Sequence, residues 1–277
     1  MCGRYASSSR PEDLVEQFEV DEDRTWQASR SILATPQSPP AGQPDYNMAP
    51  TKQAPVVMTR AVQGDSGVAP LRQLRLLTWG LVPSWSKNVK VGLRLINARS
   101  ESLLDKPAFA RAAAVRRCLV PADGWFEWQA SPTAVDGKGR PRKQPFFIHR
   151  SDGAPLAMAG LYEFWRDPSK AEGEPEAWLT TYTIITTKAE SGLDRIHDRQ
   201  PLVLERAEWD DWLDPGQNDL SAVMAHLGFS EPGRFDAYPV STAVNSSRSN
   251  GERLLLPLMR ADLVGVVDPT TGEIIGE

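Results

Sequence analysis

The 277-residue chain has few residues that bind metals or form cross-links: two cysteines, Cys2 and Cys118, and three histidines, His149, His197 and His226. Two cysteines cannot build a disulfide framework, and we expect no structural bridge in a reducing compartment. The histidines show no metal-ligand spacing with one another or with the cysteines, which argues against a zinc site. We therefore expect neither a metal nor another cofactor.

Long apolar runs are also missing. No stretch approaches the ~18 consecutive apolar residues of a transmembrane helix. The first residues lack the basic and then apolar pattern of a secretory signal, so we expect a cytoplasmic protein without a membrane partner. The sequence has no internal repeat, and no shift in composition marks a linker. We expect one domain over residues 1–277 and no obligate protein partner.

Basic residues are unevenly distributed. The net charge of −5 and the pI near 5.4 argue against a generic nucleic-acid-binding protein. Residues 72–117 nevertheless contain ten basic and two acidic residues, a local net charge of +8. Such a strip could follow a phosphate backbone, or it could be an ordinary solvated face. The charge pattern alone leaves both interpretations open.

Short strands dominate the predicted secondary structure. Apolar and β-branched stretches predict strands at residues 54–59, 71–77, 117–121, 145–149, 156–161, 181–186 and 201–204. Helical patterns occur at residues 11–20, 100–114, 187–194, 206–213 and 217–227. Stretches rich in Gly, Pro and polar residues indicate loops at residues 21–45, 61–70, 131–142 and 167–175. The sequence thus predicts a strand-rich mixed domain with peripheral helices.

Cys2 could have chemistry that no internal cysteine has. Removal of Met1 is expected because the second side chain is small, and it would leave an α-amine and a thiol on adjacent carbons of Cys2. The amine could condense with an aldehyde to an imine, and the thiol could then close a thiazolidine ring. An α-amine with a pKa near 7.7–8.0 is partly neutral at physiological pH, unlike a lysine. The alternative is that a cysteine at this position is accidental.

Three further polar residues lie in apolar surroundings. Asn97 follows a strand-like run, Glu127 lies between aromatic residues, and His197 is the histidine best placed to titrate near neutral pH. Desolvation among Trp and Phe side chains would raise the pKa of Glu127 and suit it to proton transfer. Each residue also has a purely structural interpretation. Asn97 could cap a loop, Glu127 could pair with an arginine, and His197 could bond to a neighbour.

Taken together, these segments resemble the SOS-response-associated peptidase (SRAP) family, the abasic-site processing proteins. The resemblance covers about residues 2–260 and rests on eight motifs in the family's order: MCGRY at 1–5, YNMAP at 46–50, WGLVPSW at 79–85, INARSE at 96–101, ADGWFEW at 122–128, QPFFI at 144–148, IHDRQPLVL at 196–204 and PVSTAVN at 239–245. The resemblance implies an α+β fold with an open, barrel-like core of mainly antiparallel strands and peripheral helices.

The resemblance also implies an activity, the capture of abasic (AP) sites in single-stranded DNA as a covalent thiazolidine crosslink that shields the lesion from strand cleavage. Cys2 would be the nucleophile and Asn97 would orient it. Glu127 would manage protons at the amine and imine, and His197 would protonate the sugar ring oxygen as it opens. The same residues would suit reversal of the crosslink.

The partner implied by the resemblance is single-stranded DNA with an abasic site, including strands at single-strand/double-strand junctions, with which the protein would associate in the nucleoid. The residues that would contact the DNA are Arg4, Asn47, Pro50, Trp85, Arg99, Lys106, Arg116, Trp128 and Arg248. Ser86 departs from members that have a second aromatic residue there, which predicts weaker stacking.

Two other classes of function fit the same residues. An N-terminal cysteine could serve an autopeptidase that removes Met1, or another amidohydrolase, with its own amine as the base. A non-covalent single-strand DNA-binding module would not need Cys2. The substitution Cys2→Ala separates this module from crosslinking, because it should abolish a thiazolidine and leave strand binding almost unchanged. Cys118 is expected to be a buried core cysteine in a strand and is assigned no role.

Overall fold

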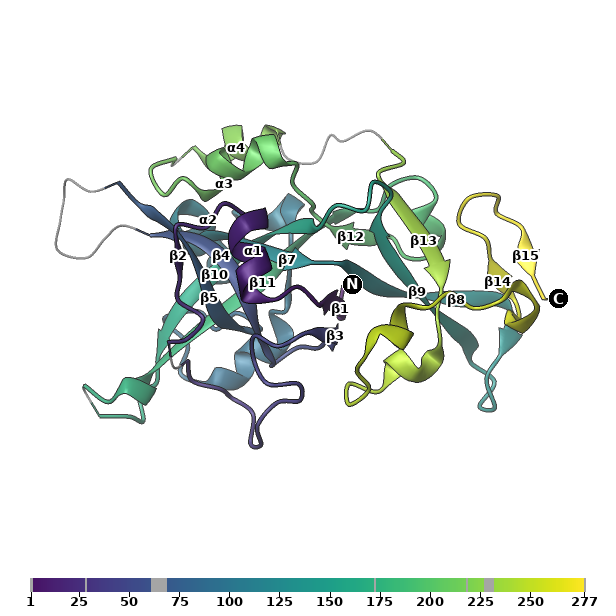
Figure 1. Cartoon of the computed structure of the whole chain (residues 1–277), viewed down its shortest axis with the longest axis horizontal. Coiled ribbons are helices and arrows are strands. Elements are labelled where there is room, and N and C mark those ends of the chain that lie inside the picture. Colours follow the sequence, from purple (N-terminus) through teal and green to yellow (C-terminus); the bar gives the residue numbers. More distant parts are fainter. Residues whose placement is uncertain are drawn as a thin grey trace.

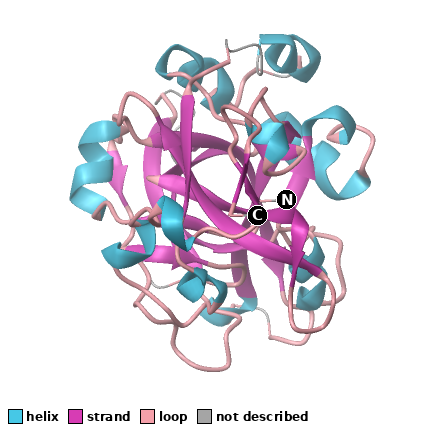
Figure 2. Ribbon diagram, turned by 90° about the vertical axis from the view of Figure 1, so that its right-hand side faces the viewer, coloured by secondary structure: helices cyan, strands magenta, loops and turns pink. Residues whose placement is uncertain are grey.

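Strands make up the centre of the molecule and helices lie on its outside (Figure 1, Figure 2). The computed structural model describes residues 2–27, 29–60, 69–171, 173–217, 219–226 and 232–276. Five strands form a ring at the centre: β4 (Gln53–Arg60), β5 (Leu71–Trp79), β7 (Arg117–Ala122), β10 (Leu156–Arg166) and β11 (Trp178–Lys188).

The ring is a small barrel. Its neighbours pair antiparallel in the order β11, β10, β7, β4 and β5, and a parallel pairing of β5 with β11 completes it at Thr78↔Thr181 and Trp79↔Tyr182. The expected α+β fold with a barrel-like core of mainly antiparallel strands is confirmed. The parallel pairing closes a ring that was expected to be open. Three short strands extend this sheet: β2 (Glu22–Asp23), β6 (Asn97–Arg99) and β12 (Arg199–Pro201).

Successive side chains of the barrel strands point alternately into the barrel and away from it, and this produces an inner and an outer apolar layer. Leu77 and Trp79 of β5 pack with the residues that fill the barrel, whereas Leu74 packs with the residues outside it. Helices cover that outer layer with buried side chains such as Leu14, Phe109 and Trp212. The helices are α1 (Pro11–Gln17), α2 (Pro107–Val115), α3 (Trp209–Leu213) and α4 (Leu220–His226).

A second sheet lies against one end of the barrel. Its strand order is β13 (Phe235–Pro239), β9 (Pro141–Arg150), β8 (Gly124–Val135), β1 (Tyr5–Ser7) and β3 (Asp45–Met48). A small hairpin of β14 (Val266–Val267) and β15 (Ile274–Ile275) lies beside the C-terminus, at the right-hand end of the molecule in Figure 1. Short 3₁₀ turns occupy Val89–Arg94, Ser100–Ser102, Pro175–Ala177, Leu193–Arg195, Arg206–Glu208, Thr242–Asn245, Glu252–Leu255 and Arg260–Asp262.

Two sequence-based assignments are wrong. Residues 131–142 were expected to form a loop, but the β8–β9 hairpin continues to Val135↔Pro141, so only residues 136–140 turn. The Asp136 carboxylate closes this turn by accepting hydrogen bonds from Arg140 at 2.8 and 3.0 Å. The helix expected at residues 187–194 is absent, because β11 continues to Lys188 and only a 3₁₀ turn follows.

The other elements follow the sequence more closely. The helices expected at 11–20, 206–213 and 217–227 are present, whereas the one at 100–114 is divided because Pro107 starts α2. Of the strand expected at 201–204, only Pro201 belongs to β12. The loop expected at 61–70 lies outside the described residues except for its last two. The region 21–45 contains β2 and the first residue of β3. No described helix has the length and apolar character needed to cross a bilayer.

Gly124, at the start of β8, lies where a larger side chain does not fit. A Cβ on Gly124 would lie 2.5 Å from the Ile148 carbonyl oxygen and against the Phe147 ring. We expect Gly124→Ala to lower the free energy of unfolding by about 1–3 kcal/mol, measured by urea denaturation. Gly137→Ala, where a Cβ meets nothing within 4 Å, is the control and should leave stability unchanged or slightly raised. Equal effects of the two substitutions would contradict the prediction.

Candidate active site

The beginning of the chain is built into the second sheet. Tyr5 pairs with Trp125 of β8, and the Phe126 N–H donates to the Arg4 carbonyl at 2.9 Å. Continued towards the N-terminus, this register places Gly3 opposite Glu127. Cys2 is fully buried. Burial raises the pKa of its thiol, and the charge of Glu127 raises it further. The backbone of β8 thus brings Cys2 and Glu127 together.

Asn97 fixes the carbonyl group of Cys2. It is the first residue of β6, next to Ile184 of β11, and its Nδ2 donates to the Cys2 carbonyl oxygen at 2.7 Å. The neighbouring Ile96 carbonyl accepts a hydrogen bond from Trp79 Nε1 at 2.8 Å, which fixes β6 against the barrel. The Asn97 Oδ1 atom is buried and accepts no hydrogen bond from the part of the chain that the structure describes. It could accept one from an amine or hydroxyl beside Cys2.

Glu127 has the electrostatics of a proton-transfer group. Its side chain is only 2% exposed, and burial raises its pKa from 4.5 to about 7, although the positive charge of the amino terminus acts against the shift. A carboxyl group with this pKa is present in both protonation states near neutral pH. Glu127 can therefore both accept and donate a proton beside Cys2.

His197 lies in the loop between β11 and β12. The Arg199 backbone N–H donates to its Nδ1 at 3.0 Å, so the neutral ring carries its proton on Nε2. Asp198 Oδ1 also lies 2.9 Å from Nδ1, a contact that would favour the protonated ring. We favour the neutral form because Asp198 is 84% exposed and burial, the largest effect, lowers the pKa of His197.

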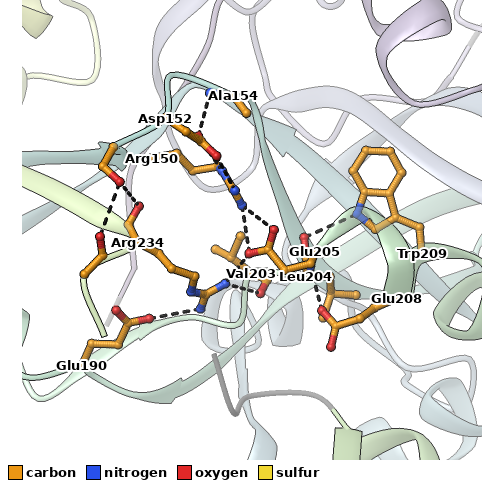
Figure 3. Close-up of polar contacts among 12 residues, drawn as sticks. Arg150, Asp152, Ala154, Glu190, Val203, Leu204, Glu205, Glu208, Trp209 and Arg234 are labelled. Atoms are coloured by element: carbon orange, nitrogen blue, oxygen red, sulfur yellow. Dashed lines mark hydrogen bonds and ion pairs between the residues drawn. The ribbon is translucent and has the colours of Figure 1, made fainter. Parts of the chain in front are cut away.

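Charged side chains anchor the loop that carries His197 (Figure 3). Glu190 pairs with Arg234 at 3.0 Å, and its backbone N–H donates to Gln200 Oε1 at 2.8 Å. Arg234 also binds Glu205 at 2.8 Å, and Arg150 binds the same carboxylate at 3.0 Å. This network joins the loop to the ends of β9 and β13, so the position of His197 depends on both sheets.

Two of the predicted DNA contacts form an internal clamp. Arg4 NH1 donates to Asn47 Oδ1 at 2.7 Å and to the Val244 carbonyl at 2.9 Å. Asn47 is fully buried, and its Nδ2 donates to the carbonyls of Ser246 at 2.9 Å and Ser249 at 3.0 Å. Burial lowers the pKa of Arg4. The clamp holds the turn on which the exposed Arg248 lies. Asn47 is thus placed to position this turn, and it is not at the surface.

Other predicted contacts lie at the surface. Trp85 is 64% exposed, and its segment is fixed because Trp165 Nε1 donates to the Ser86 carbonyl at 2.7 Å. Trp128 is partly buried and donates through Nε1 to Asn245 Oδ1 at 2.7 Å. Arg99 and Lys106 are exposed, and Pro50 is partly exposed.

The basic strip of residues 72–117 does not form one surface. Arg72 pairs with Glu19 and Asp210, and the buried Arg117 donates to backbone carbonyls. Arg116, predicted to bind DNA, is largely buried and pairs with Glu163 at 2.8 Å. It precedes β7 at the barrel end away from Cys2, because β7 runs towards the Cys2 end. Arg116 is the predicted contact that this arrangement favours least.

The pairing of two tyrosines beneath the site had no sequence signal. The hydroxyl oxygens of Tyr5 and Tyr182 lie 2.6 Å apart inside the barrel, and the Tyr5 ring meets Trp79 edge-on at 5.1 Å. Their strands are distant in sequence, so only the folded chain relates them. Cys118 is buried in β7, and burial raises the pKa of its thiol. Among the described residues no three His, Cys, Asp or Glu side chains could together hold a metal ion.

The raised pKa of Glu127 predicts a pH-dependent gain in stability for Glu127→Gln. Between pH 4.5 and about 7 the folded protein binds more protons than the unfolded chain, so the wild-type carboxyl group reduces stability as the pH rises. The penalty is complete above about pH 7 and amounts to at most about 3 kcal/mol. Urea denaturation should show the variant more stable than wild type at pH 8 and similar to it at pH 4.5. A difference independent of pH would contradict this, and Glu252→Gln at an exposed glutamate is the control.

Comparison with known proteins places the chain in a family. A family model described as SOS response associated peptidase (SRAP) matches residues 1–247. The abasic site processing protein YoqW of Bacillus subtilis is 35% identical over 257 residues, 92% of this chain and 99% of that protein. The mouse abasic site processing protein HMCES is 31% identical over 305 residues, 97% of this chain and 78% of that protein.

Solved structures share the fold. A Bacteroides thetaiotaomicron protein superposes with a TM-score of 0.68 at 21% identity, covering 93% of this chain and all of that one. A phage-related protein of Bordetella bronchiseptica has a TM-score of 0.59 at 30% identity, covering 91% of this chain and 100% of that one. With a family model that spans most of its length, the chain belongs to the SRAP family.

Proposed function

We propose that this protein processes abasic sites in DNA by capturing them in single-stranded DNA as a thiazolidine crosslink to Cys2, after removal of Met1. The observation that carries the proposal is the convergence on Cys2 of Asn97, through a 2.7 Å hydrogen bond, and of Glu127, a buried acid with a pKa near neutrality. The names of the relatives support the same substrate class.

Glu127 supplies the proton transfers that the reaction needs. The neutral α-amine of Cys2 adds to the sugar aldehyde, and the carbinolamine loses its hydroxyl group as water to give an imine. Glu127 accepts a proton from the ammonium form of the amine and returns it to the departing hydroxyl group. The thiol has a raised pKa, so its proton must also be removed as sulfur bonds to the imine carbon. That proton ends on the nitrogen, and the balance is one aldehyde and one aminothiol giving one thiazolidine and one water.

His197 and the Cys2 thiol act at two further steps, the opening of the sugar ring and the removal of the imine. An abasic sugar exists mostly as a closed hemiacetal, so capture needs an acid at the ring oxygen, and the Nε2–H of neutral His197 can donate there. An imine alone would leave the DNA open to β-elimination and strand cleavage. Ring closure by the thiol removes the imine. The same residues, acting in the reverse order, would release the DNA.

The surrounding surface supplies the strand contacts. Trp85 offers a base-stacking face, and the exposed Arg99, Lys106 and Arg248 offer phosphate contacts. Pro50 and Trp128 shape the path of the strand, and a sharp turn there would suit single-strand/double-strand junctions. Arg4 and Asn47 act through the turn that carries Arg248.

The chemistry predicts that Cys2→Ala abolishes the stable crosslink. A purified, Met1-processed protein and an abasic single-stranded oligonucleotide should give a heat-stable shifted band on a denaturing gel. Cys2→Ala keeps the α-amine, so it should give a band only after borohydride reduction of the imine. Cys118→Ala, which removes the other cysteine, and an undamaged strand are the controls. No band from protein whose free N-terminal Cys2 is verified by mass spectrometry would overturn the proposal and favour an amidohydrolase or autopeptidase.

The exposed ring of Trp85 predicts a contribution to strand affinity. In a Cys2→Ala background, Trp85→Ala should weaken the binding of an undamaged single strand about tenfold, in line with the loss of one stacked base. Fluorescence anisotropy of a labelled oligonucleotide measures this effect. Trp26→Ala removes a tryptophan that is 74% exposed elsewhere, and it should leave the affinity unchanged. Equal losses in the two variants would show that Trp85 has no particular role.

A further inference from the structure

Arginine side chains gather at the barrel end that faces away from Cys2. Every second side chain of β4 and β5 points into the barrel. Val56 and Met58 of β4 do so, and Arg60 is the next such position. On β5, Arg75 lies two positions from the inward-facing Leu77 and therefore also points inward. Arg75 lies about 13 Å along β5 from Trp79, which is at the Cys2 end. Apolar side chains between the two ends fill the barrel, so this end is separate from the proposed crosslinking site.

Positive charge at this end exceeds negative charge. Of four arginines, Arg24 contacts Glu22, and Arg116 pairs with Glu163 at 2.8 Å. The other two, Arg60 and Arg75, make no ion pair with any described residue. The Arg60 guanidinium lies 4.7 Å from the centre of the Phe164 ring. Arg75 Nε donates only to the neutral Gln73, at 2.9 Å. Glu22 acts on Arg75 electrostatically but makes no ion pair with it, so two half-buried guanidinium groups lack an ion-pair partner among the described residues.

The electrostatic effects of these groups on one another indicate that they lie close together. Burial lowers the pKa of Arg75, the charges of Arg60 and Arg24 lower it further, and the charge of Glu22 acts in the opposite direction. Burial raises the pKa of the Tyr162 hydroxyl to about 12, against the charges of Arg60, Arg116 and Arg75. The Tyr162 side chain is only 4% exposed and packs edge-on against Phe164, with ring centres 5.6 Å apart. A phenol thus lies under the arginines and offers a further hydrogen-bond donor.

We propose that this arginine cluster binds a phosphate group, with Arg60 and Arg75 as the direct ligands and Tyr162 as a further donor. The planar fork of a guanidinium matches two phosphate oxygens, and a dianion would supply the ion-pair partner that both groups lack. The group could belong to a free phosphate or to a nucleic-acid backbone. Neither source involves Cys2, so the proposal does not rest on the crosslinking activity.

Thermal unfolding tests the site with two probes, inorganic phosphate and an undamaged dT20 oligonucleotide, against sodium chloride at matched ionic strength. The test variant is Arg60→Gln/Arg75→Gln. The control, Arg111→Gln/Arg253→Gln, removes the same charge from two exposed arginines. Without phosphate, the test variant should unfold at or above the wild-type temperature, because a buried like-charge contact is relieved. Arg75→Lys keeps the positive charge but removes the planar guanidinium. It provides a second test if the double variant does not fold.

Phosphate should raise the unfolding temperature of wild type and control by several degrees, and that of the test variant not at all, with a smaller rise for Arg75→Lys. If dT20 stabilises the test variant less than the control and free phosphate has no effect, the ligand is a backbone phosphate and the site stands. The proposal is overturned if neither probe raises the wild-type unfolding temperature beyond the salt control. It is also overturned if test and control variants respond equally to both probes.

Discussion

The position of the first few residues inside a sheet is the constraint on which the candidate site depends. β1 has partners on both sides, because Tyr5 pairs with Trp125 and with Met48. Tyr5 is therefore held more firmly than residues close to a chain terminus usually are. Asn97 then fixes the carbonyl of Cys2 from a third element. A nucleophile on a flexible terminus would lose its orientation, whereas one held by three elements is oriented before any substrate arrives.

Burying the site destabilises its ionisable groups in their charged forms. Glu127 is a buried acid whose charged form is destabilised by burial. Natural sequences keep such unfavourable groups where chemistry needs them. The Arg199 backbone N–H donates a hydrogen bond to Nδ1 of His197, which fixes the neutral tautomer with its proton on Nε2. The site thus combines a buried carboxyl group with a pKa of about 7 and an imidazole whose proton lies on Nε2.

Sequence patterns indicated the surroundings of single residues better than they indicated the architecture. The aromatic neighbours of Glu127 correctly indicated a carboxyl group with a raised pKa, because desolvation is a local effect. Sheet closure depends on residues far apart, such as the parallel pair Trp79↔Tyr182, and no local pattern encodes it. The clamp has the same origin, since Arg4 and Val244 are 240 positions apart. β1 itself escaped prediction because three residues are too few for a periodic signal.

Strand alternation explains why a basic stretch of sequence is not a basic surface. Arg72 and Arg75 are three positions apart on one strand, so they face opposite sides of the barrel wall: Arg72 meets acidic residues outside, and Arg75 faces the barrel end. The +8 stretch also winds through β5, β6, α2 and β7, which carries its charges to both ends of the barrel. A strand bound near Cys2 therefore cannot use the whole stretch. Under the proposed function it would need cations from elsewhere in the chain, and the clamped turn with Arg248 would supply one from the C-terminal part.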